Sequence, residues 1–468
     1  MHAEQAYAFR HALLRDAAYQ LQLPGDRAQL HVLAFAAIEE LAGGRPPEPP
    51  PLDAARQLPF QPHSTDAFAE ELAAHAGMSG DAAMRIVWKL YLRRAAEHSE
   101  RQFRFAGSCS SWRQYAALSS GSEKGESLHR AAQAAGRGGL PRIAEPLFRE
   151  ALATFREADD RSAEGVVLRN LAILHWETGR VEQAERVHEQ ALTVYREVGD
   201  RRAEGIALGN LALLYQGTGR VDQAERAYEQ ALAIRREIGD RHLEGSALGN
   251  LANLYGETGR IEQAERAYEQ AIAIDREVSD RRLEGIALGN LACLYENTGR
   301  VEEAEQTFQR ALAIHREVGN RRSEGITLGN LASLFQGSER VEQAELTGEQ
   351  ALTIHREVGN RRDEGVALGN LAGVYKVTGR FEQAESTYEQ ALAIHREVGD
   401  RLMEGSHICS YARLLLALGR LPEARQAWHK GKTILQEIHD TRELERQTAA
   451  TREACAKMGV PFFEKDRT

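Results

Sequence analysis

The chain repeats one short text with a period of 40 residues. Residues 199–238 read GDRRAEGIALGNLALLYQGTGRVDQAERAYEQALAIRREI, and residues 239–278 read GDRHLEGSALGNLANLYGETGRIEQAERAYEQAIAIDREV. Nearly the same text returns at 279, 319 and 359. A fixed period of this length predicts a solenoid, in which neighbouring copies stack and bury a continuous core. We therefore expect function to lie on the surface that the copies build together, because no single copy carries a chemical constellation.

The register holds without insertion from Gly121 to Asp440 and gives eight units, which start at 121, 161, 201, 241, 281, 321, 361 and 401. Each unit predicts a helix A, a Thr-Gly-Arg turn and a helix B, at about 162–177 and 181–198 in the second unit. Residues 40 apart form a column, named here by its member in the second unit. Column 179 is glycine in seven units and Glu339 in the other, which suits a helix end that needs positive φ.

Both helices carry one apolar stripe at the spacing i, i+3, i+4 and i+7. Helix A keeps Leu168, Leu171 and Ala172, and helix B keeps Ala184 and Ala191 on either side of a large residue in column 188. Column 184 is alanine in all eight units. Alanines that face an aromatic side chain let neighbouring helices approach to about 8–10 Å, so we expect tight helical hairpins.

The pattern L…LA…Y followed by A…Y…A resembles the tetratricopeptide repeat. The phrase LGNLAxLYxxTGRxEQAE resembles the subgroup of kinesin light chains, nephrocystin-type proteins and spindle-orientation adaptors. HEAT-type solenoids also have units near 40 residues, but they do not explain the alternation of alanine and aromatic residues. The resemblance implies an all-α fold, a right-handed superhelix of helical hairpins. It also implies a non-catalytic scaffold that binds an extended peptide segment of a partner protein in its concave groove.

The rest of the chain divides by composition and helical periodicity. The expected parts are an N-terminal helical pair at 1–43, a proline-rich linker at 44–65, a helical region at 66–120, the repeat array at 121–440, and a capping helix and tail at 441–468. The linker holds seven of the twelve prolines, which predicts an extended or flexible, exposed connector.

Residues 7–118, which include YAFRHALLRDAAYQ and FAEELAAHA, resemble the helical segment that follows the ATPase module in bacterial multidomain signalling ATPases. No GxxxxGK[ST] motif occurs in the chain. This resemblance implies an alternative function, the regulatory or sensor arm of an ATP-dependent signalling or transcription-regulating system. The ATPase or kinase would then be on another chain.

Composition narrows the class of protein. The net charge of −10 argues against a general nucleic-acid binder, which needs a basic face. The four cysteines, Cys109, Cys293, Cys409 and Cys455, have no CxxC spacing, so no zinc site or disulfide framework is indicated. The first twenty residues lack a signal-peptide core, and no apolar run approaches the ~20 residues of a membrane span. We expect a cytoplasmic protein with no cofactor, no nucleic-acid partner and no membrane partner.

The face of helix A opposite the buried stripe is the candidate recognition surface. On a helical wheel, column 173 lies opposite the buried stripe, and column 176 lies at the edge of this opposite face. Both columns vary from unit to unit while the apolar columns do not, which suits either peptide recognition or a merely solvated face. The candidate binding residues from these two columns are Gln216, Asn253, Glu296, Ser333 and Lys376.

Column 170 supplies the other candidates, Asn170, Asn210, Asn250, Asn290, Asn330 and Asn370. Asparagine is a poor residue for a helix interior, so something must offset its cost at each copy. One interpretation is a ladder of amides that pair with the backbone of a bound peptide, since a carboxamide both donates and accepts. The other is a hydrogen bond to the adjoining unit.

Three further patterns suggest structural roles. His315, His355 and His395 form a column, but successive units lie about 8–10 Å apart, too far for a shared metal with ligands near ~2 Å. The glycines of columns 165 and 169 predict close helix packing first and close ligand approach second. The connections REVGDRRxEG predict exposed charge pairs, each worth about 0–1 kcal/mol.

The unit at 321–360 departs from the others, because Gly348 replaces the large residue of helix B and Glu339 replaces the turn glycine. An unfilled aromatic site costs about 3–5 kcal/mol. We therefore predict that this unit is the least stable part of the array or the site of a small pocket. No Ser/His/Asp, paired-carboxylate or metal-ligand spacing rises above background, so an enzyme is not predicted.

Overall fold

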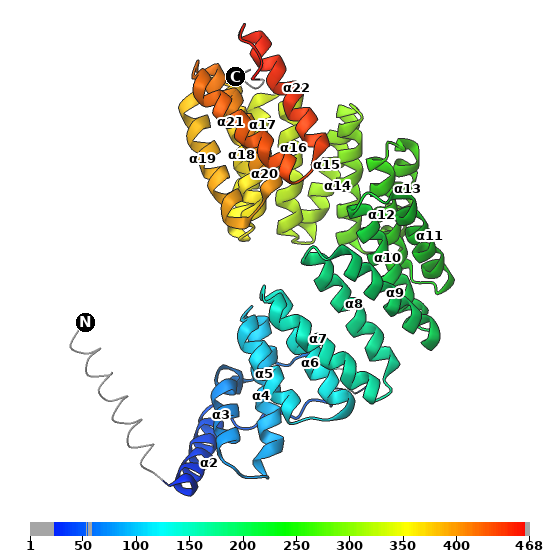
Figure 1. Ribbon diagram of the computed structural model, residues 1–468, viewed down its shortest axis with the longest axis vertical. Helices are drawn as coiled ribbons and strands as arrows, with labels where there is room; N and C mark the ends of the chain where they lie inside the picture. Colours follow the sequence, from blue (N-terminus) through cyan, green and yellow to red (C-terminus); the bar gives the residue numbers. More distant parts are fainter. Residues whose placement is uncertain (1–22, 53, 55–58, 464–468) are drawn as a thin grey trace, which may run out of the picture. The chain divides into compact units, whose positions relative to one another are not determined.

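The computed structural model describes residues 23–52, 54 and 59–463, and this part of the chain contains helices and connections but no strand (Figure 1). Five of the described helices precede the array: α2 (Pro24–Leu41), the 3-10 helix η1 (Ser64–Phe68), α3 (Ala69–Met78), α4 (Met84–Arg101) and α5 (Phe105–Ala117). Helix α2 falls within the predicted N-terminal pair, whose other member lies outside the described residues.

Each 40-residue unit forms one helical hairpin, which confirms the prediction of an all-α solenoid. The hairpins are α6 (Gly121–Arg137) with α7 (Pro141–Glu157), α8 (Arg161–Glu177) with α9 (Val181–Val198), α10 (Arg201–Gly217) with α11 (Val221–Glu237), α12 (Arg241–Glu257) with α13 (Ile261–Glu277), α14 (Arg281–Asn297) with α15 (Val301–Glu317), α16 (Arg321–Gly337) with α17 (Val341–Glu357), α18 (Arg361–Val377) with α19 (Phe381–Val398), and α20 (Arg401–Ala417) with α21 (Leu421–Glu437). Helix α22 (Thr441–Lys457) follows them.

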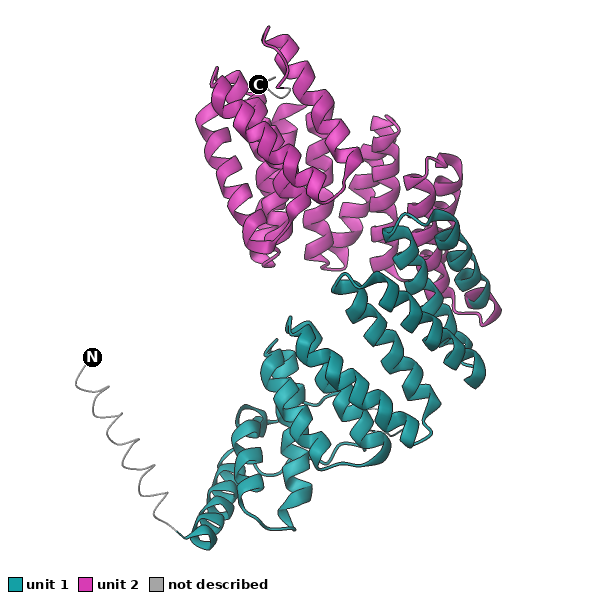
Figure 2. Cartoon of the chain, viewed as in Figure 1, with its two compact units in different colours: residues 1–234 teal, residues 235–468 magenta. Residues whose placement is uncertain are grey.

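The chain forms two compact units, each of which contains several of the 40-residue repeats (Figure 2). From here on, the first unit means residues 1–234 and the second unit means residues 235–468, and each 40-residue copy is called a repeat. The boundary lies within α11. In the first unit, α3 to α9 pack in chain order, each against the next. In the second unit, the hairpins from α12 to α21 stand side by side, and α22 packs against α20 and α21 (Figure 1).

The proline-rich stretch before η1 is not exposed throughout. Arg93 of α4 donates from Nη1 to the carbonyl of Pro50 at 2.5 Å, and Leu52 is buried. Arg94 pairs with the buried Asp66 at 2.7 Å and donates to the carbonyl of Gln61 at 2.9 Å. Two arginines of α4 therefore contact this stretch, whose other described residues are mostly exposed or half-buried.

The predicted apolar stripes form the core of the array. Leu168, Leu171 and Ala172 are 1%, 4% and 0% exposed, and the alanines of column 184 are fully buried. Column 165 glycines leave room for the column 195 side chain of the same hairpin. A Cβ on Gly285, for example, would lie 2.7 Å from the ring of His315. Close packing is therefore confirmed for column 165. In column 169 it holds for Gly369, where a Cβ would clash with the ring of His407, but not for Gly249 and Gly329, where a Cβ would meet nothing within 4 Å.

The connections between repeats contain a buried carboxylate, so the prediction of exposed charge pairs is wrong for one member of each. The glutamate of column 164 is only 1–5% exposed in the repeats from the second to the eighth: Glu164, Glu204, Glu244, Glu284, Glu324, Glu364 and Glu404. In the repeat that starts at 321, Glu324 accepts from Nε of Arg316 at 2.9 Å and from Nη1 of Arg321 at 2.6 Å. Two guanidinium groups thus satisfy each buried carboxylate, a stronger arrangement than a surface ion pair.

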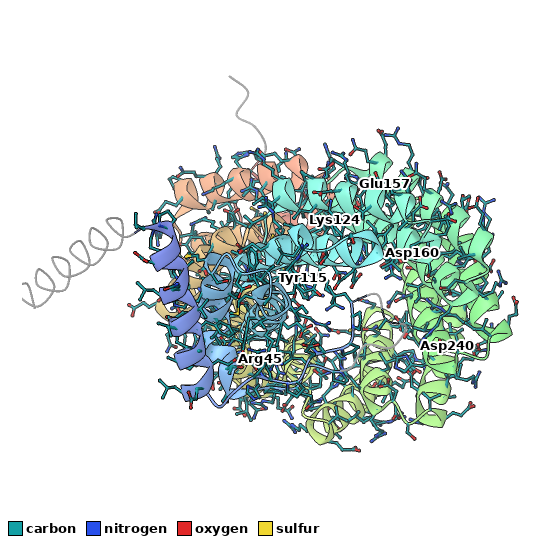
Figure 3. The ribbon with its side chains drawn as sticks, turned by 90° about the horizontal axis from the view of Figure 1, so that it is seen from below. Arg45, Tyr115, Lys124, Glu157, Asp160 and Asp240 are labelled. Carbon is teal, nitrogen blue, oxygen red and sulfur yellow. The ribbon has the colours of Figure 1, made fainter. Side chains whose placement is uncertain are left out.

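Each connection also caps the next helix A. Asp160 and Asp240, both labelled in Figure 3, accept at Oδ1 from the backbone N–H of Ala163 and Leu243, at 3.0 and 3.1 Å. This N-cap satisfies one of the backbone donors that a helix start leaves without a partner. The GDR text of the repeat therefore encodes both a cap and, through its arginine, a hydrogen bond to the buried glutamate.

The Thr-Gly-Arg turn joins successive repeats. Arg300 lies over the ring of Tyr295, 4.2 Å from its centroid, and donates at 2.9 Å to Glu265 of the preceding helix B. The same pattern links Arg340 to Phe335 and Glu305. This contact explains why the arginine of TGR and the second glutamate of EQAE recur together.

Column 179 has positive φ in every repeat, from 70° to 76° at its seven glycines and 59° at Glu339. Ser279, in a connection between repeats, also has a φ of 59°, at a position where five other repeats have glycine. A non-glycine residue in this conformation costs about 1–2 kcal/mol. The turn geometry therefore dominates over the identity of the residue.

We expect Glu339→Gly and Ser279→Gly each to stabilise the protein by about 1 kcal/mol, because glycine adopts positive φ without a steric penalty. Urea unfolding, followed by circular dichroism, measures the change. The matched control is Gly299→Ala, which introduces a Cβ at a φ of 76° and should destabilise the protein. A destabilising effect of both glycine substitutions would contradict the steric explanation.

Leu371 of the next repeat packs against Gly348, which replaces the large residue of helix B. A Cβ on Gly348 would lie 2.9 Å from Cδ2 of Leu371, and Gly348 itself is buried. Leu371 therefore packs closely against the position where other repeats carry a large side chain. The prediction that this repeat is the least stable stays a prediction, and faster exchange of its amide hydrogens than in residues 241–280 would support it.

Candidate functional site

The A helices line the concave wall of each unit. Helices A of successive repeats contact one another directly, as α6 and α8 do in the first unit and α12, α14, α16, α18 and α20 do in the second. Among the described residues, helices B of successive repeats do not pack together to a comparable extent. A stack whose A helices converge is concave on the A side, and a concave solenoid wall is the usual binding surface of such arrays.

All the predicted site residues lie on this wall. Ten of them are half-buried and one, Ser333, is exposed. They are Asn170, Asn210 and Gln216 in the first unit, and Asn250, Asn253, Asn290, Glu296, Asn330, Ser333, Asn370 and Lys376 in the second. The fold therefore places them along two separately described walls.

The asparagines of column 170 fall into two groups. Nδ2 of Asn170 lies 2.7 Å from Nε2 of His129, whose Nδ1 faces Glu126 at 3.1 Å, and Nδ2 of Asn330 donates to Sγ of Cys293 at 3.4 Å. In both cases the partner lies on helix A of the preceding repeat. The other four amides have no hydrogen-bond partner within the described ranges: those of Asn210, Asn250, Asn290 and Asn370.

A hollow recurs between helices A of adjacent repeats, and we call it the inter-repeat niche. It is lined by columns 173, 176 and 177 of one repeat, by columns 170, 173 and 174 of the next, and by the large residue of column 188. Two examples in the described chain are open. One, of about 240 Å³ between α6 and α8, includes Gly136 and Asn170, and the other, of about 320 Å³ between α12 and α14, includes Gly256 and Asn290.

Column 176 determines whether a niche is open. Both open niches have glycine there, Gly136 and Gly256. Between α8 and α10 the ring of Trp176 instead reaches within 3.6 Å of where a Cβ on Gly217 would lie. Between α16 and α18, Nε2 of Gln336 lies 2.9 Å from the equivalent point on Gly373. The variable column thus sets the size and chemistry of each niche.

Tyrosine hydroxyls from helix B reach the niches, a feature that the sequence analysis missed. The hydroxyl of Tyr268 donates to Oδ1 of Asn253, and that of Tyr228 donates to Oε1 of Gln216 at 2.8 Å. Column 188 is predicted only to pack, yet its residue type varies from repeat to repeat, and the hydroxyl-bearing members Tyr228, Tyr268 and Tyr388 were a visible signal. Arg442 of α22 also lines the niche between α12 and α14, and nothing local in the sequence indicated this long-range approach.

Charged side chains occupy two niches of the second unit. Burial raises the pKa of the Glu296 carboxyl, and burial followed by the charge of Arg413 lowers the pKa of Lys376 to about 8. Arg413 of α20 donates to Gln447 at 2.6 Å and to Ser410 at 2.9 Å, and burial lowers its pKa. Within the described part of the chain, neither Glu296, Lys376 nor Arg413 forms an ion pair.

Other chemistry on the described residues is limited. They contain no group of three or more His, Cys, Asp or Glu side chains arranged to hold a metal ion. All four cysteines are free, and burial raises the pKa of the Cys293 thiol to about 12. No described helix combines the length and the apolar character that crossing a membrane requires.

Comparisons with known proteins agree with the repeat architecture. A tetratricopeptide-repeat family model matches residues 124–197, 204–277, 283–357 and 363–427. No curated protein matches the sequence significantly.

Solved structures with similar folds share little sequence with this chain. One is a signal transduction ATPase with a tetratricopeptide repeat sensor from Pyrococcus horikoshii, with 16% identity, a TM-score of 0.50, and coverage of 73% of this chain and 54% of that one. BtubC from P. vanneervenii shares 24% identity over 47% of this chain and 92% of its own, with a TM-score of 0.43. Kinesin light chain-like repeats from Podosopora anserina share 21% identity over 42% and 95%, with a TM-score of 0.37. Since the family model covers more than half of the sequence, the chain belongs to the tetratricopeptide repeat family.

Proposed function

We propose that this protein is a non-catalytic interaction scaffold that binds an extended segment of a partner protein along its concave A-helix wall. A tetratricopeptide repeat array is a protein-binding architecture. The observation that carries the finer proposal is the division of column 170. Two of its amides pair with the preceding repeat, whereas Asn210, Asn250, Asn290 and Asn370 face the wall with both amide groups unused by the described protein.

Asparagine in a helix interior lowers the stability of the helix, and an amide without a partner forms no intramolecular hydrogen bond that would offset this cost. A peptide backbone supplies the complementary groups, because each residue offers one donor and one acceptor whatever its side chain. The columns beside the amides, 173 and 176, change from repeat to repeat and would select side chains. Backbone binding through column 170 and side-chain selection through the niches together suit an extended ligand.

We expect the variant with Asn250→Ala, Asn290→Ala and Asn370→Ala to lose peptide binding at least about tenfold while its melting temperature stays within about 2 °C of wild type. None of the three amides has a hydrogen-bond partner among the described residues, and alanine is the better helix former. A random 12-residue peptide library, selected on the full-length protein, supplies the ligands. Fluorescence anisotropy then measures the affinity of each selected peptide for both proteins.

The matched control replaces three exposed glutamines of the B helices, Gln190→Ala, Gln270→Ala and Gln390→Ala, and should bind as wild type does. A library that yields no ligand, or ligands that bind both asparagine and glutamine variants equally, would remove the proposed groove. Loss of stability without loss of binding would instead assign column 170 a structural role.

The alternative, a regulatory arm for an ATPase or kinase on another chain, places the partner on residues 1–120 rather than on the array. Selected peptides that bind normally to the triple asparagine variant, and that crosslink to α2–α5, would favour it. We keep the assignments of 121–440 to the array and 441–468 to a cap and tail as part of the proposal.

A further inference from the structure

We propose that the second unit, residues 235–468, selects a peptide with one acidic and one basic side chain. The acidic side chain binds beside Lys376 and Arg413, and the basic side chain binds beside Glu296. The two side chains are about five or six residues apart in the peptide. This inference rests on the proposed groove and names the chemistry of its ligand. The preferred ligand is an extended segment of a partner protein with one acidic and one basic anchor.

The basic end is formed by two neighbouring cations, and neither forms an ion pair with a described residue, although the charge of Glu443 acts on Arg413 at longer range. Lys376 of α18 is half-buried and has no polar partner within the described residues. The guanidinium group of Arg413 in α20 donates hydrogen bonds to the uncharged side chains of Gln447, Thr451 and Ser410, at 2.6, 3.4 and 2.9 Å. Adjacent half-buried positive charges repel one another and are poorly hydrated, so a carboxylate between them would offset both costs.

The acidic end is a single half-buried carboxylate, which also lacks an ion pair among the described residues. Glu296 of α14 is half-buried, and no hydrogen bond or ion pair satisfies it in the described chain. The neighbouring amide of Asn330 is already directed to Cys293. Burial alone raises the pKa of Glu296, which means that its charged form lacks stabilisation. A lysine or arginine side chain of the ligand would supply it.

The spacing follows from the stack. Glu296 and Lys376 belong to the same column, two repeats apart, and the intervening helix α16 contacts both α14 and α18. Each step between packed helices is about 8–10 Å, so the two anchors lie roughly 16–20 Å apart. An extended chain rises about 3.3 Å per residue, and this distance therefore corresponds to about five or six residues.

A protein segment suits this arrangement better than a nucleic acid does. The wall carries a negative charge at Glu296 and positive charges at Lys376 and Arg413, whereas a phosphate backbone needs a continuous basic track. The overall charge of −10 also disfavours a polyanion. Phosphorylated peptides and single-stranded DNA are the competing occupants that the experiment must distinguish.

The experiment uses blocked, fluorescein-labelled peptides of Ser, Ala and Gln that carry one Glu and one Lys, separated by two to nine positions and in both orders. Anisotropy with the full-length protein should give a minimum in Kd at a separation of five or six, about tenfold below the uncharged peptide, in one of the two orders. Lys376→Met should remove the preference for Glu, and Glu296→Gln the preference for Lys. Lys430→Met, an exposed lysine of α21, is the matched control and should change neither.

The exchanged protein, with Glu296→Lys and Lys376→Glu together, should reverse the preferred order of charges if it keeps the wild-type circular dichroism spectrum and melting temperature. Affinities that do not depend on separation or order, or no binding by any charged peptide, would overturn the inference. Binding by phosphoserine peptides or single-stranded DNA alone would also overturn it. Uncharged peptides that bind and depend on Asn250, Asn290 and Asn370 would meanwhile leave the proposed function intact.

Discussion

Replacing Arg316 and Arg321 together with alanine is expected to destabilise the protein by about 3 kcal/mol at neutral pH. Both guanidinium groups serve Glu324, which is 4% exposed and would keep its buried charge without a partner. Removing one side of a fully buried ion pair costs about 3–5 kcal/mol. The lower figure applies because both arginines are about half exposed, so water can enter the space that they leave.

The pH dependence gives this prediction a sign. Burial opposes ionisation of Glu324, but hydrogen bonds from Arg316 and Arg321 outweigh it and hold the pKa below its ordinary value. A depressed pKa adds stability above the pKa of the unfolded chain, and this stability is lost as the pH falls. In the double variant burial alone remains, so the deficit should be largest at pH 7 and should shrink towards pH 4.

A rescue variant separates the buried charge from the loss of side-chain packing. Adding Glu324→Gln to the two alanine substitutions should recover part of the stability in urea unfolding at pH 7, because a neutral amide is cheaper to bury than a carboxylate. Arg322→Ala changes an exposed arginine of the same connection and should cost less than about 0.5 kcal/mol. A double variant that loses no more than two surface pairs would mean that Glu324 is solvated in solution.

The helical hairpins were predictable because eight copies of one text report the same packing constraints. The columns of Leu168, Ala172 and Ala184 keep their residue type, and the structure buries all three. The turn was predictable for the same reason, since column 179 demands positive φ even where Glu339 occupies it. Repetition within one chain thus gave each position several independent observations.

The buried glutamate of column 164 was missed because charge was taken as a sign of exposure. The text REVGDRRxEG looks like a solvated connection, and the carboxylate is buried only because two arginines from different helices reach it. The signal was present, since column 164 keeps glutamate in the repeats from the second to the eighth, but a periodicity argument assigns constancy to apolar columns. Tertiary pairing decides this position.

The candidate site was predictable as a face but not in its details. Helical geometry placed columns 170, 173 and 176 on one side of helix A. Sequence could not show that Asn170 and Asn330 have partners while Asn250 has none, because the difference depends on His129 and Cys293 in the preceding repeats. The open niches depend on contacts between repeats in the same way.

Acid is expected to destabilise the second unit by about 3 kcal/mol between pH 6.5 and pH 4 through one histidine pair. Nε2 of His395 lies 2.9 Å from Nδ1 of His407, both side chains are buried, and Gly369 leaves the space that the His407 ring fills. Burial, followed by the charge of His395, lowers the pKa of His407 to about 3. Because the folded pKa lies below the ordinary value of 6.5, this contribution is complete above pH 6.5 and is lost as the pH falls.

His407→Gln keeps an amide that can donate to His395 but removes the titration, so its stability should change much less between pH 6.5 and pH 4 than that of wild type. Hydrogen exchange at both pH values locates the effect, which should centre on 361–440, because α18 and α20 carry the packing around the pair. His429→Gln, a partly exposed histidine of α21, should keep the full acid response of wild type. Equal acid responses of the two variants would show that carboxylates elsewhere, and not the buried pair, control acid unfolding. A hairpin that opens first under acid would also release the Arg413 side of the groove, so the same measurement tests whether ligand binding and this core pair are coupled.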